Sequence, residues 1–221
     1  MISGFFEESI VKRAIEKKLV EVDLINLRDF AIDDYGAVDD RPYGGGAGMI
    51  LRIEPIYKAL SIITNDQISR NKQTKIILTS PKGKVFDQKK AQQYSKLDHL
   101  IIIAGHYEDV DARVLEYVDE EISMGDFVLT GGEIPASAIV DSVVRLIPGV
   151  LKKDQATIQE SFNIGDKKLL EYPQYTRPEE FMGKKVPEVL LSGDHKKIKE
   201  WQMEKSLEET RKKRPDLDTC K

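Results

Sequence analysis

Apolar residues recur at helix and strand spacings along the first two thirds of the chain. Residues 5–18 carry apolar side chains three and four positions apart, which predicts a helix with one buried face. Residues 20–27 alternate between apolar and polar and predict a strand. Short apolar runs at 75–79 and 100–104 predict buried strands. Further helices are expected at 55–63, 87–94, 110–117 and 134–146.

Strands that alternate with helices indicate an α/β fold, with a mostly parallel sheet and helices on both faces. Ligands of such sheets bind beyond the carboxyl ends of the strands. Three glycine-bearing segments lie where strands are expected to end, at 79–84, 104–111 and 123–133. The pattern therefore predicts a ligand crevice formed by these three loops.

The pattern of apolar and polar residues changes after residue 150. Residues 1–152 hold the alternating elements and are expected to form the α/β domain. Residues 153–176 are polar and aperiodic, which predicts an interdomain linker. Residues 177–221 predict a small helical domain whose long helix is capped by Asp194.

Composition narrows the class of protein. Hydrophobic residues make up 40% and charged residues 33% of the 221 positions, which is typical of globular domains. The apolar runs are too short to span a bilayer, and the amino terminus lacks the pattern of a signal peptide. Cys220 is the single cysteine, so a disulfide scaffold and a thiolate zinc site are excluded and a cytoplasmic location is expected.

Charge is distributed unevenly. The chain carries a net charge of −4, which argues against a uniformly basic nucleic-acid-binding protein. Residues 177–221 nevertheless hold 12 basic and 10 acidic residues, a net charge of +2. The basic runs at 196–199 and 211–214 suit either a solvated helix face or a nucleic-acid contact.

Four glycines stand close together after Arg41 and Tyr43, at positions 44, 45, 46 and 48. The segment does not match the phosphate-binding P-loop or the dinucleotide-binding pattern. Residues 81–84 contain a Gly-Lys pair, but Val85 replaces the hydroxyl that a P-loop requires. Chemistry alone leaves the glycine segment as either a structural crossing point or the wall of a ligand site.

Several polar and charged residues are candidate site residues, and each has a functional and a structural interpretation. His106, Tyr107 and Glu108 follow a buried strand and suit either a binding site or a hydrogen-bonded loop. The three histidines do not have the spacing of metal ligands, so no metal site is predicted. Arg145 in an apolar helix suits either function or an ion pair with the aspartate four residues earlier. Glu160 by itself resembles any exposed glutamate.

Eight motifs together resemble the bacterial tRNA (guanine-N1)-methyltransferase family, TrmD, of the SPOUT class. The resemblance extends from the first helix to about Leu217. The motifs occur in the order VDDRPYGGGAGM, SPKGKVFDQ, GHYEDVDARV, EEISMGDFVLTGGE, DSVVRLIPGVL, YPQYTRP, VPEVLLSGDH and RPDL.

The resemblance implies a fold with a deep trefoil knot and a homodimer with its active site at the subunit interface. It also implies that the three loops bind S-adenosylmethionine. The cofactor residues implied are Ser80, Pro81, Gly105, Tyr107, Glu108, Met124, Gly125, Asp126, Phe127, Val128, Leu129, Gly131, Gly132 and Pro135.

The implied reaction is methylation of N1 of guanosine at tRNA position 37, next to the anticodon. Glu160, supplied by the partner subunit, would be the base that removes the N1 proton, and Arg145 would stabilise charge on the guanine oxygen. Magnesium would be required, without a site that the sequence identifies. The helical tail would hold the anticodon stem. The substrate contacts implied are Arg41, Tyr43, Gly44, Gly45, Lys212 and Lys213.

This chain departs from the family pattern at three site positions. His106 stands where an arginine is usual, Asp109 replaces a glycine, and Glu160 replaces an aspartate. The chain also starts later and ends earlier than its family usually does, so we expect one strand and part of the tail to be absent. These departures keep a second hypothesis open, a non-catalytic relic that binds tRNA or the cofactor. A nucleotide phosphate enzyme is the third hypothesis and rests only on the glycine loop and residues 81–84.

Overall fold

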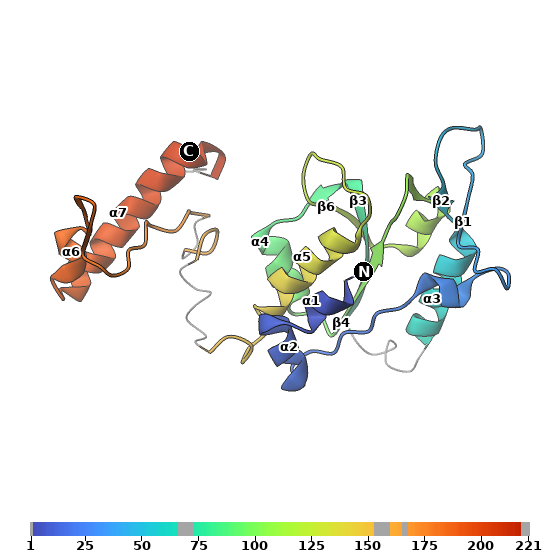
Figure 1. Ribbon diagram of the computed structural model, residues 1–221, viewed down its shortest axis with the longest axis horizontal. Coiled ribbons are helices and arrows are strands. Elements are labelled where there is room, and N and C mark those ends of the chain that lie inside the picture. The colour runs from blue at the N-terminus through green and yellow to red at the C-terminus, as the bar shows by residue number, and fades with distance from the viewer. Residues whose placement is uncertain (1, 66–72, 153–159, 165–167, 218–221) are drawn as a thin grey trace. The chain divides into compact units, whose positions relative to one another are not determined.

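The computed structural model describes residues 2–65, 73–152, 160–164 and 168–217. The chain forms two compact units, Met1–Lys152 and Lys153–Lys221, each with its own elements (Figure 1). The first unit contains α1 (Ser3–Phe6), α2 (Ser9–Glu16), the 3₁₀ helix η1 (Leu27–Phe30), β1 (Asp39–Asp40), β2 (Ile50–Leu51), α3 (Ile53–Asn65), β3 (Thr74–Val85), α4 (Gln88–Tyr94), β4 (His99–Ala104), β5 (Asp109–Val110), the 3₁₀ helix η2 (Ala112–Tyr117), β6 (Glu120–Ser123) and α5 (Glu133–Val144).

The main sheet of the first unit is parallel, as the sequence predicts. Strand β3 lies in the centre, with β4 on one side and β6 on the other. The register of β3 against β6 shifts, because Thr79 and Lys84 both pair with Ile122. Residues 80–83 therefore leave the ladder and return to it at the edge where the pocket lies.

Helices cover both faces of this sheet, which confirms the predicted layers (Figure 1). Neighbouring residues of β3 are both buried and point to opposite faces, as expected for a covered parallel strand. Leu78 packs against α3 through Ile56, while Ile77 packs against α4 and α5 through Ala91 and Ile139. A second, smaller sheet has the order β1-β2-β5, with β2 parallel to β5.

Two expectations at the amino terminus are wrong. Residues 20–26 form no strand, and η1 begins at Leu27. Leu24 and Ile25 are each 51% exposed, so the alternation does not bury one side against a sheet. The helix expected over 5–18 is divided into α1 and α2, because Glu8 is extended and Ser9 has a positive φ of 56°.

The segment expected as a helix over 110–117 is instead strand β5 followed by η2, which is a 3₁₀ helix. The other predicted helices and strands of the first unit are present, and β3 continues six residues past its expected end at residue 79. No helix within the described ranges is long and apolar enough to cross a membrane.

The second unit is organised around one long helix. Asp194 caps it as predicted, since its carboxylate accepts from Lys196 N and Lys197 N at 3.1 and 3.2 Å. The elements of this unit are β7 (Glu180–Phe181), β8 (Lys184–Lys185), α6 (Glu188–Leu191), α7 (His195–Lys213) and the 3₁₀ helix η4 (Pro215–Leu217).

Part of the segment expected to be a linker packs on this helix. Leu169 is buried, and Leu170 N donates to Thr210 Oγ1 at 2.8 Å. Tyr172 lies against Trp201, with ring centroids 6.3 Å apart. The described residues 168–176 therefore belong with the helical tail, while 153–159 and 165–167 lie outside the described residues.

Candidate active site

A pocket of the first unit lies at the carboxyl ends of β3, β4 and β6. The three loops that follow these strands form its walls, at the sheet edge where the sequence predicts a ligand crevice. Among the predicted cofactor residues, Asp126 alone does not line it and is exposed to solvent. The lining is Thr79, Ser80, Pro81, Gly105, His106, Tyr107, Glu108, Asp109, Ile122, Ser123, Met124, Gly125, Phe127, Val128, Leu129, Gly131, Gly132 and Pro135.

The loops approach each other so closely that glycine is required. Gly132 N donates to Gly105 O at 2.6 Å. A Cβ atom on Gly132 would lie 2.1 Å from Thr79 Oγ1 and 2.8 Å from Gly105 N. Because glycine allows this approach, the loops after β4 and β6 can lie directly against each other in the pocket wall.

Tyr107 has a strained backbone within the pocket. Its φ is 61°, in the left-handed region that residues with a Cβ rarely occupy. Tyr107 is 48% exposed, and its ring meets the ring of His106 edge to face, with centroids 4.6 Å apart. Such backbone strain is found preferentially at functional sites.

One side of the pocket is apolar and open to solvent. Phe127, Val128 and Leu129 are 56%, 88% and 37% exposed. Ile134, at the start of α5, is 61% exposed as well but does not line the pocket. Contiguous exposed apolar side chains mark a binding surface more often than a free surface.

The lysine of the Gly-Lys pair has a carboxylate partner. Lys82 donates to Asp109 across the pocket rim, and this hydrogen bond raises the pKa of Lys82. Asp109 is the residue that stands where the family usually has glycine. The pairing gives Lys82 a local partner in the unliganded protein.

The glycine loop between β1 and β2 reaches the pocket residue Glu108 at Gly48 and at Met49, whose carbonyl accepts from Glu108 N at 3.2 Å. Gly48 has a φ of 86°, and a Cβ atom there would lie 2.4 Å from Glu108 Cγ. Gly44 and Gly45 also have positive φ, but a Cβ atom on either would meet nothing within 4 Å. Glycine at position 48 therefore allows the loop to lie close to Glu108. Glycine at positions 44 and 45 instead allows the positive φ of the turn.

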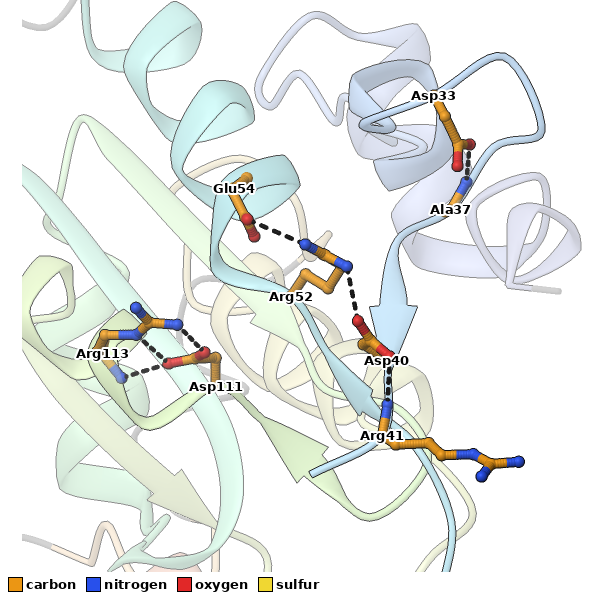
Figure 2. Close-up of polar contacts among 8 residues, drawn as sticks. All are labelled: Asp33, Ala37, Asp40, Arg41, Arg52, Glu54, Asp111 and Arg113. Carbon is orange, nitrogen blue, oxygen red and sulfur yellow. Dashed lines mark hydrogen bonds and ion pairs between the residues drawn. The ribbon is translucent and has the colours of Figure 1, made fainter. Parts of the chain in front are cut away.

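The base of this loop is fixed by ion pairs. Arg52 binds Asp40 at 2.8 Å and Glu54 at 3.1 Å. Figure 2 shows that the Arg41 side chain points away from this network. Tyr43 is fully exposed, so both predicted substrate contacts are available to a ligand.

The two predicted catalytic residues belong to different units. Arg145 follows α5 as its C-cap, so it stands at the end of the apolar helix rather than inside it, and it is half-buried. Glu160 is half-buried in the second unit, where its carbonyl accepts from Asn163 N at 3.0 Å. Lys212 and Lys213 are exposed on the last turn of α7, and Lys213 is paired with Glu209.

The cofactor residues named from the sequence leave out three further residues that line the pocket, although two of them lie in the loops predicted to form it. Thr79, Ile122 and Ser123 stand at or next to the points where β3 leaves the ladder and β6 ends. The rule that ligands bind at the carboxyl ends of parallel strands could have identified them. Within the described ranges, no three His, Cys, Asp or Glu residues lie close enough to hold a metal ion.

Comparison with known proteins identifies the family. The family model of tRNA (Guanine-1)-methyltransferase TrmD matches residues 1–219. A tRNA (guanine-N(1)-)-methyltransferase from Dictyoglomus turgidum is 51% identical over 98% of this chain and 85% of its own length. Those from Bacillus pumilus and Clostridium botulinum are 49% and 50% identical, over 100% and 97% of this chain and 89% and 87% of theirs. The chain therefore belongs to the tRNA (guanine-1)-methyltransferase TrmD family.

Proposed function

We propose that this protein transfers a methyl group from S-adenosylmethionine to N1 of guanosine at tRNA position 37. The observation that carries the proposal is family membership over residues 1–219, in a chain whose pocket lies at the carboxyl ends of parallel strands. We further propose that the chain around the pocket forms the trefoil knot of its class.

The pocket fits S-adenosylmethionine chemically. Glycines 105, 131 and 132 line it, and no side chain separates their backbone from a ligand, which suits the polar edges of an adenine and a ribose. Residues 127–129 add an apolar side for the flat faces of the base. Bound S-adenosylmethionine supplies a methyl group activated by a sulfonium ion.

The chain's own residues prepare the acceptor. Guanine N1 carries a proton, and Glu160 accepts it as general base. Arg145 stabilises the negative charge that then develops on the guanine oxygen. Arg41, Tyr43, Gly44 and Gly45 contact the guanine, which leaves its base stack to reach the pocket.

We propose that two subunits complete each active site. The exposed apolar side chains at 127–129 and at Ile134 support a homodimer interface beside the pocket. In the homodimer, Glu160 reaches the site from the partner subunit. The basic end of α7, with Lys212 and Lys213, holds the anticodon stem. Magnesium acts with the tRNA, since the described residues offer no cluster of acidic ligands.

Methyl transfer from labelled S-adenosylmethionine to a tRNA transcript tests the function. Methylation should occur when position 37 is guanosine and be absent when that base is changed. Binding of tRNA without turnover would instead favour a non-catalytic relic. Replacing Glu160 with Gln should lower kcat by about 10²- to 10⁴-fold with little change in cofactor affinity.

A matched control variant separates the loss of a general base from the loss of a negative charge in the same unit. Glu179 is an exposed glutamate of the same unit, and its replacement with Gln should leave kcat unchanged. Equal losses in the two variants, or an equal loss of kcat and cofactor affinity at Glu160, would contradict the role of Glu160 as the base.

A further inference from the structure

The ionisable side chains of the pocket wall gather on one of its three loops. Among the described residues that line the pocket, those with a carboxylate or an imidazole are His106, Glu108 and Asp109, all in the loop after β4. The loop after β6 contributes the exposed apolar residues 127–129 instead. The pocket therefore has an ionic side and an apolar side.

Lys82 and Asp109 form an ion pair at the rim of the ionic side. Lys82 Nζ donates to Asp109 Oδ2. Lys82 belongs to residues 80–83, which leave the ladder of β3, and its backbone N donates to Ser80 Oγ at 3.2 Å. Asp109 is the first residue of β5 and pairs with Ile50 of β2. Two separately anchored segments thus hold opposite charges side by side.

Both groups of the pair can form further hydrogen bonds. An ionised carboxylate accepts through several lone pairs, and an ammonium group donates from each of its N–H bonds. Asp109 accepts from Lys82 with one oxygen and from Val110 N, at 2.8 Å, with the other. Its side chain is 30% exposed, and that of Lys82 is 70% exposed. A ligand at the rim can therefore find an acceptor and a donor at one place while the pair stays intact.

The neighbouring charges have other surroundings. Glu108 extends toward Gly48 of the glycine loop. His106 Nδ1 lies 3.2 Å from Glu133 Oε1. Glu121 of β6 is a second acidic group whose charge acts on Lys82. Among the described residues that line the pocket, Asp109 is thus the carboxylate paired with a lysine.

We propose that Lys82 and Asp109 form the subsite for the amino-acid end of S-adenosylmethionine. Asp109 accepts from the α-ammonium group, and Lys82 donates to the α-carboxylate, so both contacts are charge-assisted hydrogen bonds. The apolar residues 127–129 take the adenine, and the two sides together set the direction in which the cofactor lies. The proposal rests on the proposed function, because it takes S-adenosylmethionine as the cofactor. Asp109 stands where the family usually has glycine, so this subsite distinguishes the chain from relatives with the usual residue.

Calorimetry with two matched thioether nucleosides tests the subsite. S-Adenosylhomocysteine carries the amino-acid end, whereas 5′-methylthioadenosine lacks it, and the native protein should bind the first more tightly. Asp109→Asn should weaken binding of S-adenosylhomocysteine by about three- to tenfold and leave that of 5′-methylthioadenosine unchanged. Lys82→Gln should have the same selectivity with a smaller loss, about two- to threefold, because its ammonium group is more exposed.

Decarboxylated S-adenosylmethionine separates the roles of the two residues. It keeps the ammonium group and lacks the carboxylate. Its affinity should fall with Asp109→Asn and stay unchanged with Lys82→Gln, whereas the affinity of S-adenosylmethionine should fall with both. Equal responses of the two ligands to Lys82→Gln would contradict the contact between Lys82 and the carboxylate.

Glu116→Gln is the matched control for loss of a negative charge. Glu116 is an exposed residue of η2 outside the pocket lining, and its replacement should leave all these affinities unchanged. Equal losses of both thioether nucleosides in Asp109→Asn would show a distorted pocket and overturn the subsite. An unchanged preference for S-adenosylhomocysteine in that variant would overturn it as well. Failure of the native protein to bind any of these nucleosides would instead overturn the proposed function, and the subsite with it.

Discussion

Replacing Gly132 with alanine tests how tightly the pocket loops are packed. The added Cβ atom would lie 2.1 Å from Thr79 Oγ1, 2.8 Å from Gly105 N and 3.0 Å from Ala104 Cα. Carbon contacts are normally about 3.5–4.0 Å. Rotation of the Thr79 side chain about its Cα–Cβ bond relieves the first contact but breaks the hydrogen bond from its hydroxyl to Ile103 O. The other two atoms belong to the backbone, so α5 or the end of β4 must move by about 0.5 Å or more.

The expected loss follows from this forced movement. Overpacking of a well-filled site costs about 1–3 kcal/mol, and a backbone shift places this substitution in the upper part, at about 2–3 kcal/mol. For a chain of this size the loss lowers the thermal midpoint by about 4–12 °C. Circular dichroism during heating and urea unfolding would measure it.

Gly105→Ala is the matched control in the same pocket. Its Cβ atom would lie 3.6 Å from Val110 Cγ1 and 3.7 Å from Thr79 O, which are ordinary contacts. Its unfolding free energy should change by about 0.5 kcal/mol or less. If Gly132→Ala unfolds at the same midpoint as Gly105→Ala, the loops can yield and the packing argument is wrong.

Three further predictions concern charge. Glu120 is 15% exposed and accepts from two lysines and from Tyr94, so Glu120→Gln should lower the unfolding free energy by about 2–3 kcal/mol in urea. Burial raises the pKa of Tyr94 to about 12, so one of the eight tyrosines should ionise late in an absorbance titration. Because the folded state retains that proton, stability should fall between about pH 10 and 12, and Tyr94→Phe should remove this contribution. Lys212→Ala should reduce the salt slope of tRNA binding by about 0.9, and Lys213→Ala by less, since Glu209 already pairs with it.

The buried elements were predictable because their neighbours are apolar on every side. Ile77 and Leu78 read as one apolar run, and each is buried on a different face of the sheet. Residues 20–27 show the limit of that reasoning, since alternation does not reveal whether a neighbouring strand is present to pair with. Ser206 and Thr210 are almost fully buried within α7, although small polar residues carry no apolar signal.

The candidate site, like the fold, could be predicted from the sequence only in part. The convergence of three loops followed from the parallel sheet, and glycine positions indicated where backbones come close. The contact between Gly48 and Glu108 joins residues 60 positions apart, and no local pattern encodes it. The pair of His106 and Glu133 likewise depends on how α5 returns to the sheet. The catalytic roles of Arg145 and Glu160 stay predictions that rest on the family resemblance, because an arginine next to apolar residues and a glutamate in a polar segment each have a structural interpretation as well.

The excursion of β3 at residues 80–83 begins and ends on one partner, Ile122. Thr79 pairs with Ile122 before the excursion, and Lys84 pairs with Ile122 after it. The pairing of β3 with β6 is therefore independent of how many residues lie between Thr79 and Lys84. The return is tight, because a Cβ atom on Gly83 would lie 2.4 Å from Ile122 N. The pocket wall can therefore change in length or composition at 80–82 while the core stays in place. Evolution, or an engineer, can alter what the pocket accepts without rebuilding the sheet that supports it.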